Sequence, residues 1–296
     1  MTKVIIVHGK DILRSNGEIH SSELSQLIKK ALNILTGESS IEKSFQRILG
    51  QRKKIGIKIN TIGGKKISTR PELSLALAQV IINSSNSSRQ VIIWDRTNRE
   101  LKGAGYKLAQ GQGPISIFGT DTQGIGYHHQ LYSSPNTGSL FSRIQLDQIE
   151  ASISLAILKD HGLAGVTAGM KNYFGAIHNP NKYHDNNCDP FIPEIFSLEP
   201  LRKKHCLTIL DGLKIQFHKG PSFHERWSSR ENLLVVGVDP VAVDTVGWML
   251  IERLRSTSGL PSLREEEREP SYLKTSQKMD LGTALKEQIE INEIEA

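Results

Sequence analysis

Cysteine is scarce in this sequence, because only two of its 296 residues, Cys188 and Cys206, are cysteines. Their spacing matches no metal-ligand motif, and an iron–sulfur cluster usually needs more cysteine ligands than these. We therefore expect no iron–sulfur cluster within this chain. No pattern in the sequence supports a disulfide bond, so two free thiols, as are usual in the cytosol, are the simpler interpretation.

Long apolar runs are absent as well. No run approaches the roughly 18 residues that a membrane-spanning helix requires, so we expect no membrane partner. The first residues, MTKVIIVHGKDIL, contain a short apolar run and no small-residue cleavage pattern, so they do not predict a signal peptide. The composition, 38% hydrophobic and 23% charged, is ordinary for a globular protein. Together these features predict a cytoplasmic protein.

Acidic residues are missing from positions 43–70, a segment that holds nine basic residues. Such a segment could face a phosphate, a carboxylate or a nucleic acid, although for most of these residues a solvated surface is the simpler interpretation. Aromatic residues are absent from it after Phe45, and no recognition motif accompanies it, which disfavours nucleic acid as a partner. Residues 257–296 are acidic by contrast, and we expect them to pack on the core or to trail from it.

What the sequence does contain is a series of short apolar runs, several of them continuous rather than alternating. Such runs are typical of strands that are buried on both faces of a parallel sheet. The predicted strands are 4–7, 55–59, 91–94, 115–118, 153–158, 207–210 and 233–236. Between some of them lie predicted helices, 22–35, 72–82 and 241–254, and the last two follow the start signals Thr69-Arg70-Pro71 and Asp239-Pro240. The alternation predicts a single α/β domain over residues 1–296, with a mainly parallel sheet and helices on both faces.

Ligands of open α/β sheets bind at the carboxyl ends of the strands. Residues 158–184 begin in a predicted strand and continue as a polar, glycine-rich segment at that position. His161 and Lys171 are candidates for acid–base catalysis, and Lys171 could also hold an anion. Asn172 could orient a carbonyl or an oxyanion, while Gly175 would let the backbone approach a ligand. The turn-rich segment 176–205 predicts a long functional loop near these strand ends, and whether it closes as a lid is left open.

A second candidate group follows the earlier strands. Lys58 and Asn60 are two residues apart on one strand and therefore point to the same face. A lysine in a central strand needs a partner, because an unpaired buried charge is costly. Thr69 stands where a helix begins and could help to bind an anion through backbone N–H groups. Asp95 ends a strand and could bind a metal, a ribose or a basic partner, or cap the following turn. No Walker loop and no G-x-G-x-x-G motif is present, so nucleotide binding is unsupported.

Acidic residues near the later strands complete the candidates. Asp211 follows a predicted strand and could orient a base or ligate a metal. With His161 and His184 it could supply the three ligands of a catalytic divalent metal. Asp239 is expected to cap a helix. Asp244 could be structural or could pair with a lysine of the site.

The combined motifs resemble a bacterial and archaeal family known as domain of unknown function 362. The resemblance covers about residues 55–254 and rests on IKIN, TRP, LKDHGLAGVTAGMKNYFG, ILDG, GP and GVDPVAVD. The family typically has Lys-Thr-His where this chain has Lys159, Asp160 and His161. The resemblance implies an α/β domain and no particular activity. Some relatives are fused to ferredoxin-like modules or carry export signals, so a redox role here would need a separate redox protein.

These observations lead to three hypotheses. The first is an enzyme that acts on a small anionic substrate, with Lys58 and Lys171 holding negative charge and His161 transferring a proton. The second is a metal-dependent enzyme that uses His161 and His184. The third is a non-catalytic binding protein, or a subunit that docks on an electron-transfer partner through the basic segment.

Overall fold

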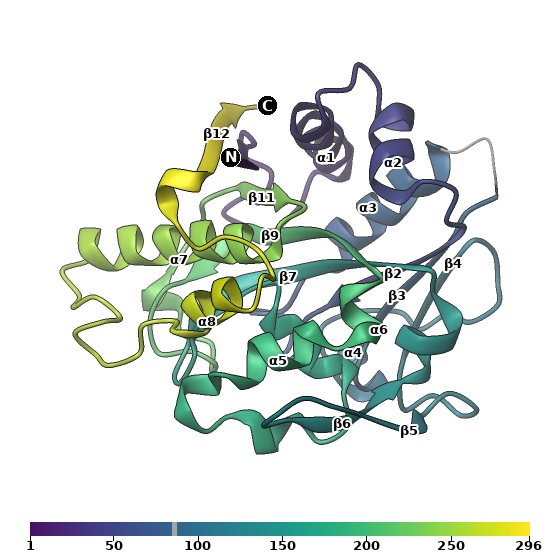
Figure 1. The fold of residues 1–296 in the computed structure, drawn as a ribbon. Helices are drawn as coiled ribbons and strands as arrows, with labels where there is room; N and C mark the ends of the chain where they lie inside the picture. The colour runs from purple at the N-terminus through teal and green to yellow at the C-terminus, as the bar shows by residue number, and fades with distance from the viewer. Residues whose placement is uncertain (85–87) are drawn as a thin grey trace.

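A large mixed sheet crosses the middle of the computed structural model, which describes residues 1–84 and 88–296 (Figure 1). Its strands are β1 (Thr2–His8), β2 (Lys54–Ile59), β3 (Gln90–Asp95), β4 (Ile115–Gly119), β7 (Ala151–His161), β8 (Gly165–Thr167), β9 (His205–Gln216), β10 (Ser228–Ser229), β11 (Leu233–Gly237) and β12 (Ile289–Glu295). A separate small sheet pairs β5 (Tyr127–Ser133) with β6 (Gly138–Ser142).

The strand order along the large sheet is β12-β1-β11-β9-β7-β2-β3-β4. All of these strands except β11 run in the same direction, which confirms the predicted mainly parallel α/β sheet. The carboxyl ends of β2, β3, β7 and β9 therefore lie along one edge. The order reverses between β2 and β7, because β3 and β4 continue on one side and β9 lies on the other. A crevice is expected at such a reversal.

Helices cover both faces of the sheet, as predicted. One core contains buried residues of α1 (Ser21–Thr36), α2 (Ile41–Leu49), α3 (Pro71–Asn83) and α4 (Asn98–Gly103). The other contains those of α5 (Phe191–Ser197), α6 (Glu199–Arg202), α7 (Pro240–Thr257) and α8 (Tyr272–Lys278). Successive residues of a strand point to opposite faces, so Leu155 of β7 packs into the first core and Ala156 into the second. Every predicted strand and helix lies within an observed one.

The start signals of the two later helices act differently. The Asp239 carboxylate accepts hydrogen bonds from the backbone N–H groups of Val241 and Ala242, each at 3.0 Å, which confirms that Asp239 caps α7. At α3, Pro71 begins the helix but no side chain caps it. The Thr69 hydroxyl instead donates to the backbone oxygen of Leu155 in β7, at 3.1 Å. Thr69 therefore fastens the start of α3 to the sheet.

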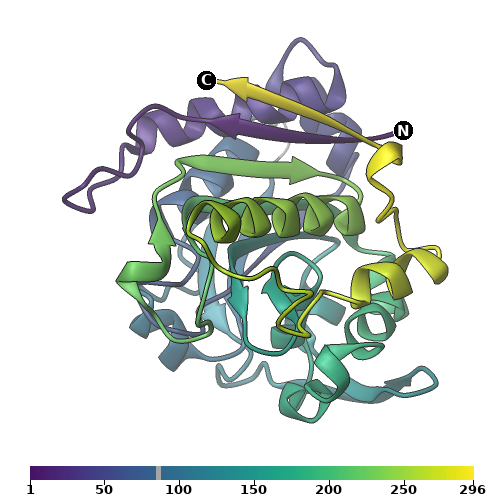
Figure 2. The ribbon, with the colours of Figure 1, turned by 90° about the vertical axis from the view of Figure 1, so that its left-hand side faces the viewer.

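The acidic segment 257–296 packs against the rest of the chain. Figure 2 shows β12 (yellow) beside β1 (purple), and the two strands pair in parallel from Thr2 to His8. Tyr272 of α8 is fully buried, and its hydroxyl donates to the Asp244 carboxylate at 3.0 Å. The segment thus adds an edge strand to the sheet and a helix to one of its faces.

The turn-rich segment 176–205 differs from the expected loop. It contains the 3₁₀ turns Pro180–Tyr183 and Asn186–Cys188 and then the helices α5 and α6. Ile192, Ile195 and Leu201 of this segment are buried in the core. The segment predicted as a long loop thus contains two short helices, which the sequence did not predict because their short apolar stretches pack against residues that are distant in the chain.

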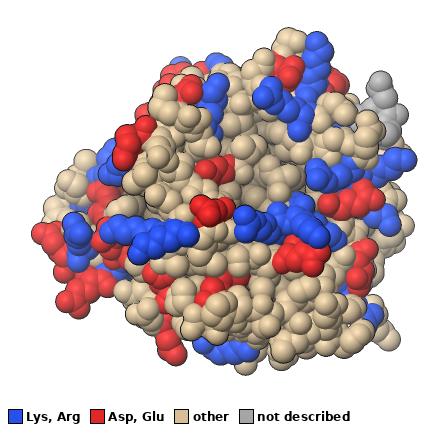
Figure 3. Space-filling view, in the orientation of Figure 1, with Lys and Arg blue, Asp and Glu red and all other residues tan. Residues whose placement is uncertain are grey.

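The surface of this face of the molecule shows mixed charge. Figure 3 shows basic and acidic side chains next to one another on the face seen in Figure 1. The overall charge of +6 is therefore not gathered into one patch of this face. Within the described residues, no helix has the length and apolar character needed to cross a membrane.

Candidate functional site

A cavity of about 210 Å³ opens at the carboxyl ends of β2, β3 and β7, where the strand order reverses. The cavity brings together the predicted site residues Lys58, Asn60, Asp95, His161, Lys171, Asn172, Gly175 and His184. Its other lining residues, which the sequence did not predict, are Ile62, Arg96, Lys159, Thr167, Phe174, Pro180, Asn181 and Pro221. Thr69 and Asp211, which were also predicted, do not line it.

Lys58 forms the centre of a buried polar network at one wall of this cavity. Its ammonium group donates to Asp95 Oδ1 at 2.6 Å, to the backbone oxygen of Ile59 at 2.7 Å and to Asn172 Oδ1 at 3.2 Å. These three acceptors use all the hydrogens of the ammonium group. Lys58 therefore has its partner within the protein, as a lysine in a central strand requires, and it has no N–H group left to hold an anion.

Asn172 is committed to the same network. Its Nδ2 donates to the backbone oxygen of Lys58 at 2.8 Å and to Ser154 Oγ at 3.0 Å. Because its Oδ1 already accepts from Lys58, the whole amide is in use. Asn172 thus positions Lys58, and the expectation that it orients a substrate carbonyl has no free atom to support it.

Asp95 completes the network from β3. Its Oδ2 accepts from the backbone N–H of Thr61 at 2.7 Å and from the Thr61 hydroxyl at 2.6 Å. Of the roles considered for Asp95, the structure thus places it beside a basic partner, Lys58. This ion pair joins the ends of β2 and β3 and leaves Asp95 little capacity for a metal or a ribose.

Gly175 lies against the same ion pair. A Cβ atom at this position would lie 2.6 Å from both Lys58 Nζ and Asp95 Oδ1, closer than real Cβ atoms approach. The glycine is therefore needed for close packing of the 3₁₀ turn Lys171–Ala176 on the network, rather than for the approach of a ligand. Asn60 lines the cavity nearby, and its Oδ1 is buried with no hydrogen-bond partner in the described part of the chain.

Lys159 lines the cavity, although its only signal in the sequence was its place in the motif of the family resemblance. Its ammonium group donates to the backbone oxygens of Ile62 at 2.8 Å and Ile67 at 3.2 Å, which leaves one N–H group for another acceptor. Burial lowers the pKa of Lys159 to about 8. The signal that could have found it is its spacing, because Lys159 and His161 are two apart on one strand and share a face.

His161 is held as a neutral ring. Its Nδ1 accepts hydrogen bonds from the backbone N–H groups of Leu163 at 3.2 Å and Ala164 at 3.1 Å, which places the proton of the neutral ring on Nε2. Burial, together with the nearby charge of Lys171, lowers the pKa of His161 to about 2. His161 can therefore donate a hydrogen bond from Nε2, but it is too weak a base for the proton transfer that the sequence suggested.

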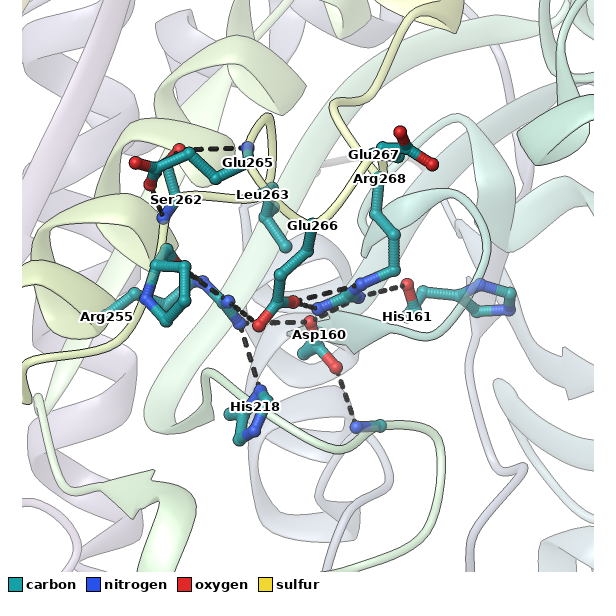
Figure 4. A network of polar contacts seen from close by, with 12 residues as sticks. Asp160, His161, His218, Arg255, Ser262, Leu263, Glu265, Glu266, Glu267 and Arg268 are labelled. Carbon is teal, nitrogen blue, oxygen red and sulfur yellow. Dashed lines mark hydrogen bonds and ion pairs between the residues drawn. The ribbon is translucent and has the colours of Figure 1, made fainter.

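A network of ion pairs holds the strand end that carries His161 (Figure 4). Arg268 donates to Asp160 Oδ1 at 2.9 Å and to the backbone oxygen of His161 at 3.0 Å. The other oxygen of Asp160 accepts from the backbone N–H of Gly220 at 2.7 Å. Arg255 forms an ion pair with Glu266, and their nearest atoms lie 2.7 Å apart. The position at which the family resemblance showed a departure, Asp160, thus ties β7 to the C-terminal segment.

Lys171 and His184 form a pair of titratable side chains in the cavity. Lys171 Nζ lies 3.1 Å from His184 Nε2, and it also lies 4.2 Å from the ring centre of Phe174. Burial lowers the pKa of Lys171 to about 8. Burial and the neighbouring Lys171 also lower the pKa of His184. Each group is therefore closer to its neutral form than it would be in water.

Asp244 fixes the backbone that leads to Lys171. Its carboxylate accepts from the backbone N–H groups of Gly169 at 2.7 Å and Met170 at 3.0 Å. Burial raises the pKa of Asp244 to about 7. Of the two roles considered for Asp244, the structure supports the structural one, because these contacts and Tyr272 occupy its carboxylate and no lysine of the described residues pairs with it.

Asp211 does not join the two histidines as a third metal ligand. It lies within β9 and is fully buried, and its oxygens accept from the backbone N–H groups of Leu213 at 3.1 Å and Arg70 at 3.4 Å. The rings of His161 and His184 stack with their centres 5.7 Å apart. Within residues 1–84 and 88–296, no three His, Cys, Asp or Glu side chains are grouped as metal ligands would be. The predicted ligand set is therefore not assembled.

Comparison with known families matches residues 55–249 to the family described as "Domain of unknown function (DUF362)". Every residue that lines the cavity falls within the matched region. No curated protein matches the sequence. Among solved structures, the chain is similar to a crystal structure of a protein from Thermotoga maritima, with 10% identity and a TM-score of 0.47. The similarity covers 82% of this chain and 60% of that one, so this chain spans less than two thirds of that structure.

Proposed function

This chain belongs to the DUF362 family, a family of unknown function. We propose that it is an enzyme that binds a small anionic substrate in the cavity at the ends of β2 and β7. The observation that supports the proposal is that two lysines are buried in the cavity without a carboxylate partner among the described residues. Lys159 and Lys171 both line the cavity, both are more than nine-tenths buried, and neither forms an ion pair with a carboxylate in the described part of the chain. A buried charge without a counter-ion is costly, so an anion that enters the cavity is stabilised there.

The size of the cavity supports a small ligand. Its volume of about 210 Å³ is below the roughly 300–1,000 Å³ of sites that hold drug-sized molecules. A short carboxylic acid or a small phosphate compound fits this volume and the charge of its lining.

The neutral His161 supports a catalytic role rather than simple binding. Its Nε2–H group has no acceptor in the described residues, and it lines the same cavity as the two lysines. A fixed neutral donor of this kind stabilises negative charge that develops on a substrate oxygen. In this proposal the lysines hold the charge that the substrate brings, and His161 donates to the oxygen whose charge grows.

The other hypotheses have weaker support. A metal-dependent reaction at His161 and His184 would have to find its third ligand outside the predicted set, because Asp211 lies elsewhere. Docking of a separate redox protein on the basic segment and a cytoplasmic location stay predictions. Co-purification at moderate salt would test the first, and cell fractionation the second.

The first test is a thermal-shift screen with acetate-sized carboxylates and inorganic phosphate. We expect these anions to raise the Tm of the protein near pH 7 and much less near pH 9, because Lys159 and Lys171 lose their protons around pH 8. Lys159→Met and Lys171→Met should each remove most of the shift. Lys107→Met, which replaces an exposed lysine, should keep it. An equal shift in all four proteins would mean that the anions bind elsewhere, and the proposal would be wrong.

A further inference from the structure

Two buried lysines that line the cavity, Lys58 and Lys171, have different surroundings. Lys58 donates to three acceptors and is paired with Asp95. Lys171 has a single polar partner in the described residues, the ring of His184. Its ammonium group also lies 4.2 Å from the centre of the Phe174 ring. In the described part of the chain, no carboxylate pairs with Lys171 as Asp95 pairs with Lys58. A lysine in such a setting is suited to react as a free amine.

We propose that Lys171 is a nucleophile that condenses with the carbonyl carbon of a small oxo acid, while Lys159 holds the carboxylate of that acid. The inference rests on the proposed function, because it assigns the anionic substrate of the same cavity to the class of aldehydes and ketones that carry a carboxylate. It adds a covalent step and a reactive atom, Lys171 Nζ.

His184 is placed to take up the proton that Lys171 must lose. Its Nδ1 lies 3.3 Å from the backbone oxygen of Asn181, which is an acceptor, so the proton of the neutral ring lies on Nδ1. Nε2 then presents its lone pair to Lys171 Nζ at 3.1 Å. Lys171 is one of the two main causes that lower the pKa of His184, and that cause disappears once Lys171 gives up its charge. The proton transfer therefore makes His184 a better base at the moment it is needed.

The free amine is accessible at ordinary pH. With a pKa of about 8, about one Lys171 in ten is neutral near pH 7. An ordinary surface lysine is neutral about once in a few thousand molecules at the same pH. This difference favours Lys171 over the surface lysines as a nucleophile. Lys159 has a similar pKa, but its ammonium group donates to the backbone oxygens of Ile62 and Ile67.

The condensation balances with the groups in the cavity. The lone pair of the Lys171 amine attacks the carbonyl carbon, a C–N bond forms, and the C=O π bond breaks to leave an oxyanion beside the Nε2–H group of His161. Proton transfer from nitrogen to this oxygen, through His184, gives a neutral carbinolamine. A further proton reaches the oxygen by the same route, the C–O bond breaks, water leaves, and an imine remains on Lys171. No oxidant or reductant takes part.

Reductive trapping tests this step. The full-length protein is incubated with glyoxylate or pyruvate and sodium cyanoborohydride near pH 7, and the adduct is located by peptide mass spectrometry. We expect the adduct at Lys171 and its rate of formation to rise up to about pH 8. Lys171→Arg keeps a positive charge but cannot form the adduct, so trapping should fall by at least about tenfold. Lys107→Met should leave trapping at Lys171 unchanged, and His184→Gln should slow it. Circular dichroism checks that each variant is folded.

Two further arms separate this inference from the proposed function. If phosphate and acetate stabilise the protein but trapping is spread over exposed lysines and is equal in Lys171→Arg, the cavity binds anions and the nucleophile is overturned. If propanal, which carries no charge, is trapped at Lys171 as well as pyruvate is, and Lys159→Met changes neither, the nucleophile stands and the anionic substrate class is overturned. Trapping of pyruvate that falls in Lys159→Met, with propanal unaffected, supports both.

Discussion

At the scale of single residues, the cavity shows how far the surroundings of a side chain decide its chemistry. Lys58 and Lys171 are both buried, but Lys58 is saturated by acceptors and Lys171 is not. His161 is neutral because two backbone N–H groups occupy its Nδ1 and burial disfavours its charged form. A lysine and a histidine in water would titrate near their ordinary pKa values, unlike Lys171 and His161. Contacts in the folded chain therefore decide that Lys58 is a fixed charge, that Lys171 is available as an amine and that His161 is a neutral donor.

Asp95→Asn tests the fixed charge. It leaves the Lys58 ammonium buried beside a neutral amide, so we expect the free energy of unfolding to fall by about 3–5 kcal/mol in urea unfolding experiments. Adding Lys58→Met should recover part of this loss, because it removes the unpaired charge. The exposed pair Glu199 and Lys203 offers a control, and Glu199→Gln should change stability by less than about 1 kcal/mol. A loss in Asp95→Asn as small as in this control would show that the pair is solvated.

At the scale of elements, the 3₁₀ turn Lys171–Ala176 carries the reactive amine and is fixed from two sides. Asp244 in α7 binds the backbone that precedes the turn, through Gly169 and Met170. Gly175 lets the turn rest directly on the ion pair that joins β2 and β3. The position of Lys171 thus depends on elements that are distant in sequence, and a small displacement of the turn should change the site more than it changes the fold.

Gly175→Ala tests this dependence. The new methyl group would lie 2.6 Å from Lys58 Nζ and Asp95 Oδ1, so the turn must move away or the ion pair must break. We expect stability to fall by about 1–3 kcal/mol and the stabilisation by small anions to be lost. Gly103→Ala is the matched control, because no atom lies within 4 Å of the added Cβ and it should preserve both properties. Thermal shifts with phosphate measure the effect, and unchanged anion binding in Gly175→Ala would contradict this account.

At the scale of the whole molecule, the C-terminal segment is part of the frame that holds the site. Arg268 reaches from residues 257–296 to Asp160 and to the backbone oxygen of His161 (Figure 4). β12 extends the sheet beside β1 at its far edge. The family match ends at residue 249, so these contacts come from outside the matched region.

Arg268→Met tests whether this frame supports the site. Asp160 would keep the N–H group of Gly220 and the charge of Arg255 at 3.9 Å, but it would lose its closest cation. We expect stability to fall by up to about 3–5 kcal/mol, as measured by urea unfolding. Asp160→Asn in the same protein should recover part of the loss. Arg264→Met, which removes an exposed ion pair with Glu269, should have little effect. If Arg264→Met loses as much stability as Arg268→Met, the contact of Arg268 with Asp160 contributes nothing specific to stability.

Much of the fold could be predicted because its signals are local. Strands such as β2 and β7 are visible as continuous apolar runs, and Asp239 and Pro240 indicate where α7 begins. The order of strand ends also placed Lys58, His161 and Lys171 near one edge of the sheet. These inferences need only the chain neighbours of each residue and the rule that parallel strands end together.

The tertiary structure decided the rest, because it depends on contacts between residues that are far apart in the chain. Lys58 meets Asn172 across 114 positions, and Lys159 meets Ile62 across 97. Such contacts determined that Lys58 is saturated, that Lys159 joins the cavity and that Asp211 stays in the interior of β9. Residue type and spacing fix which chemistry a side chain can perform, but the distribution of hydrogen-bond partners and water around it exists only in the folded chain.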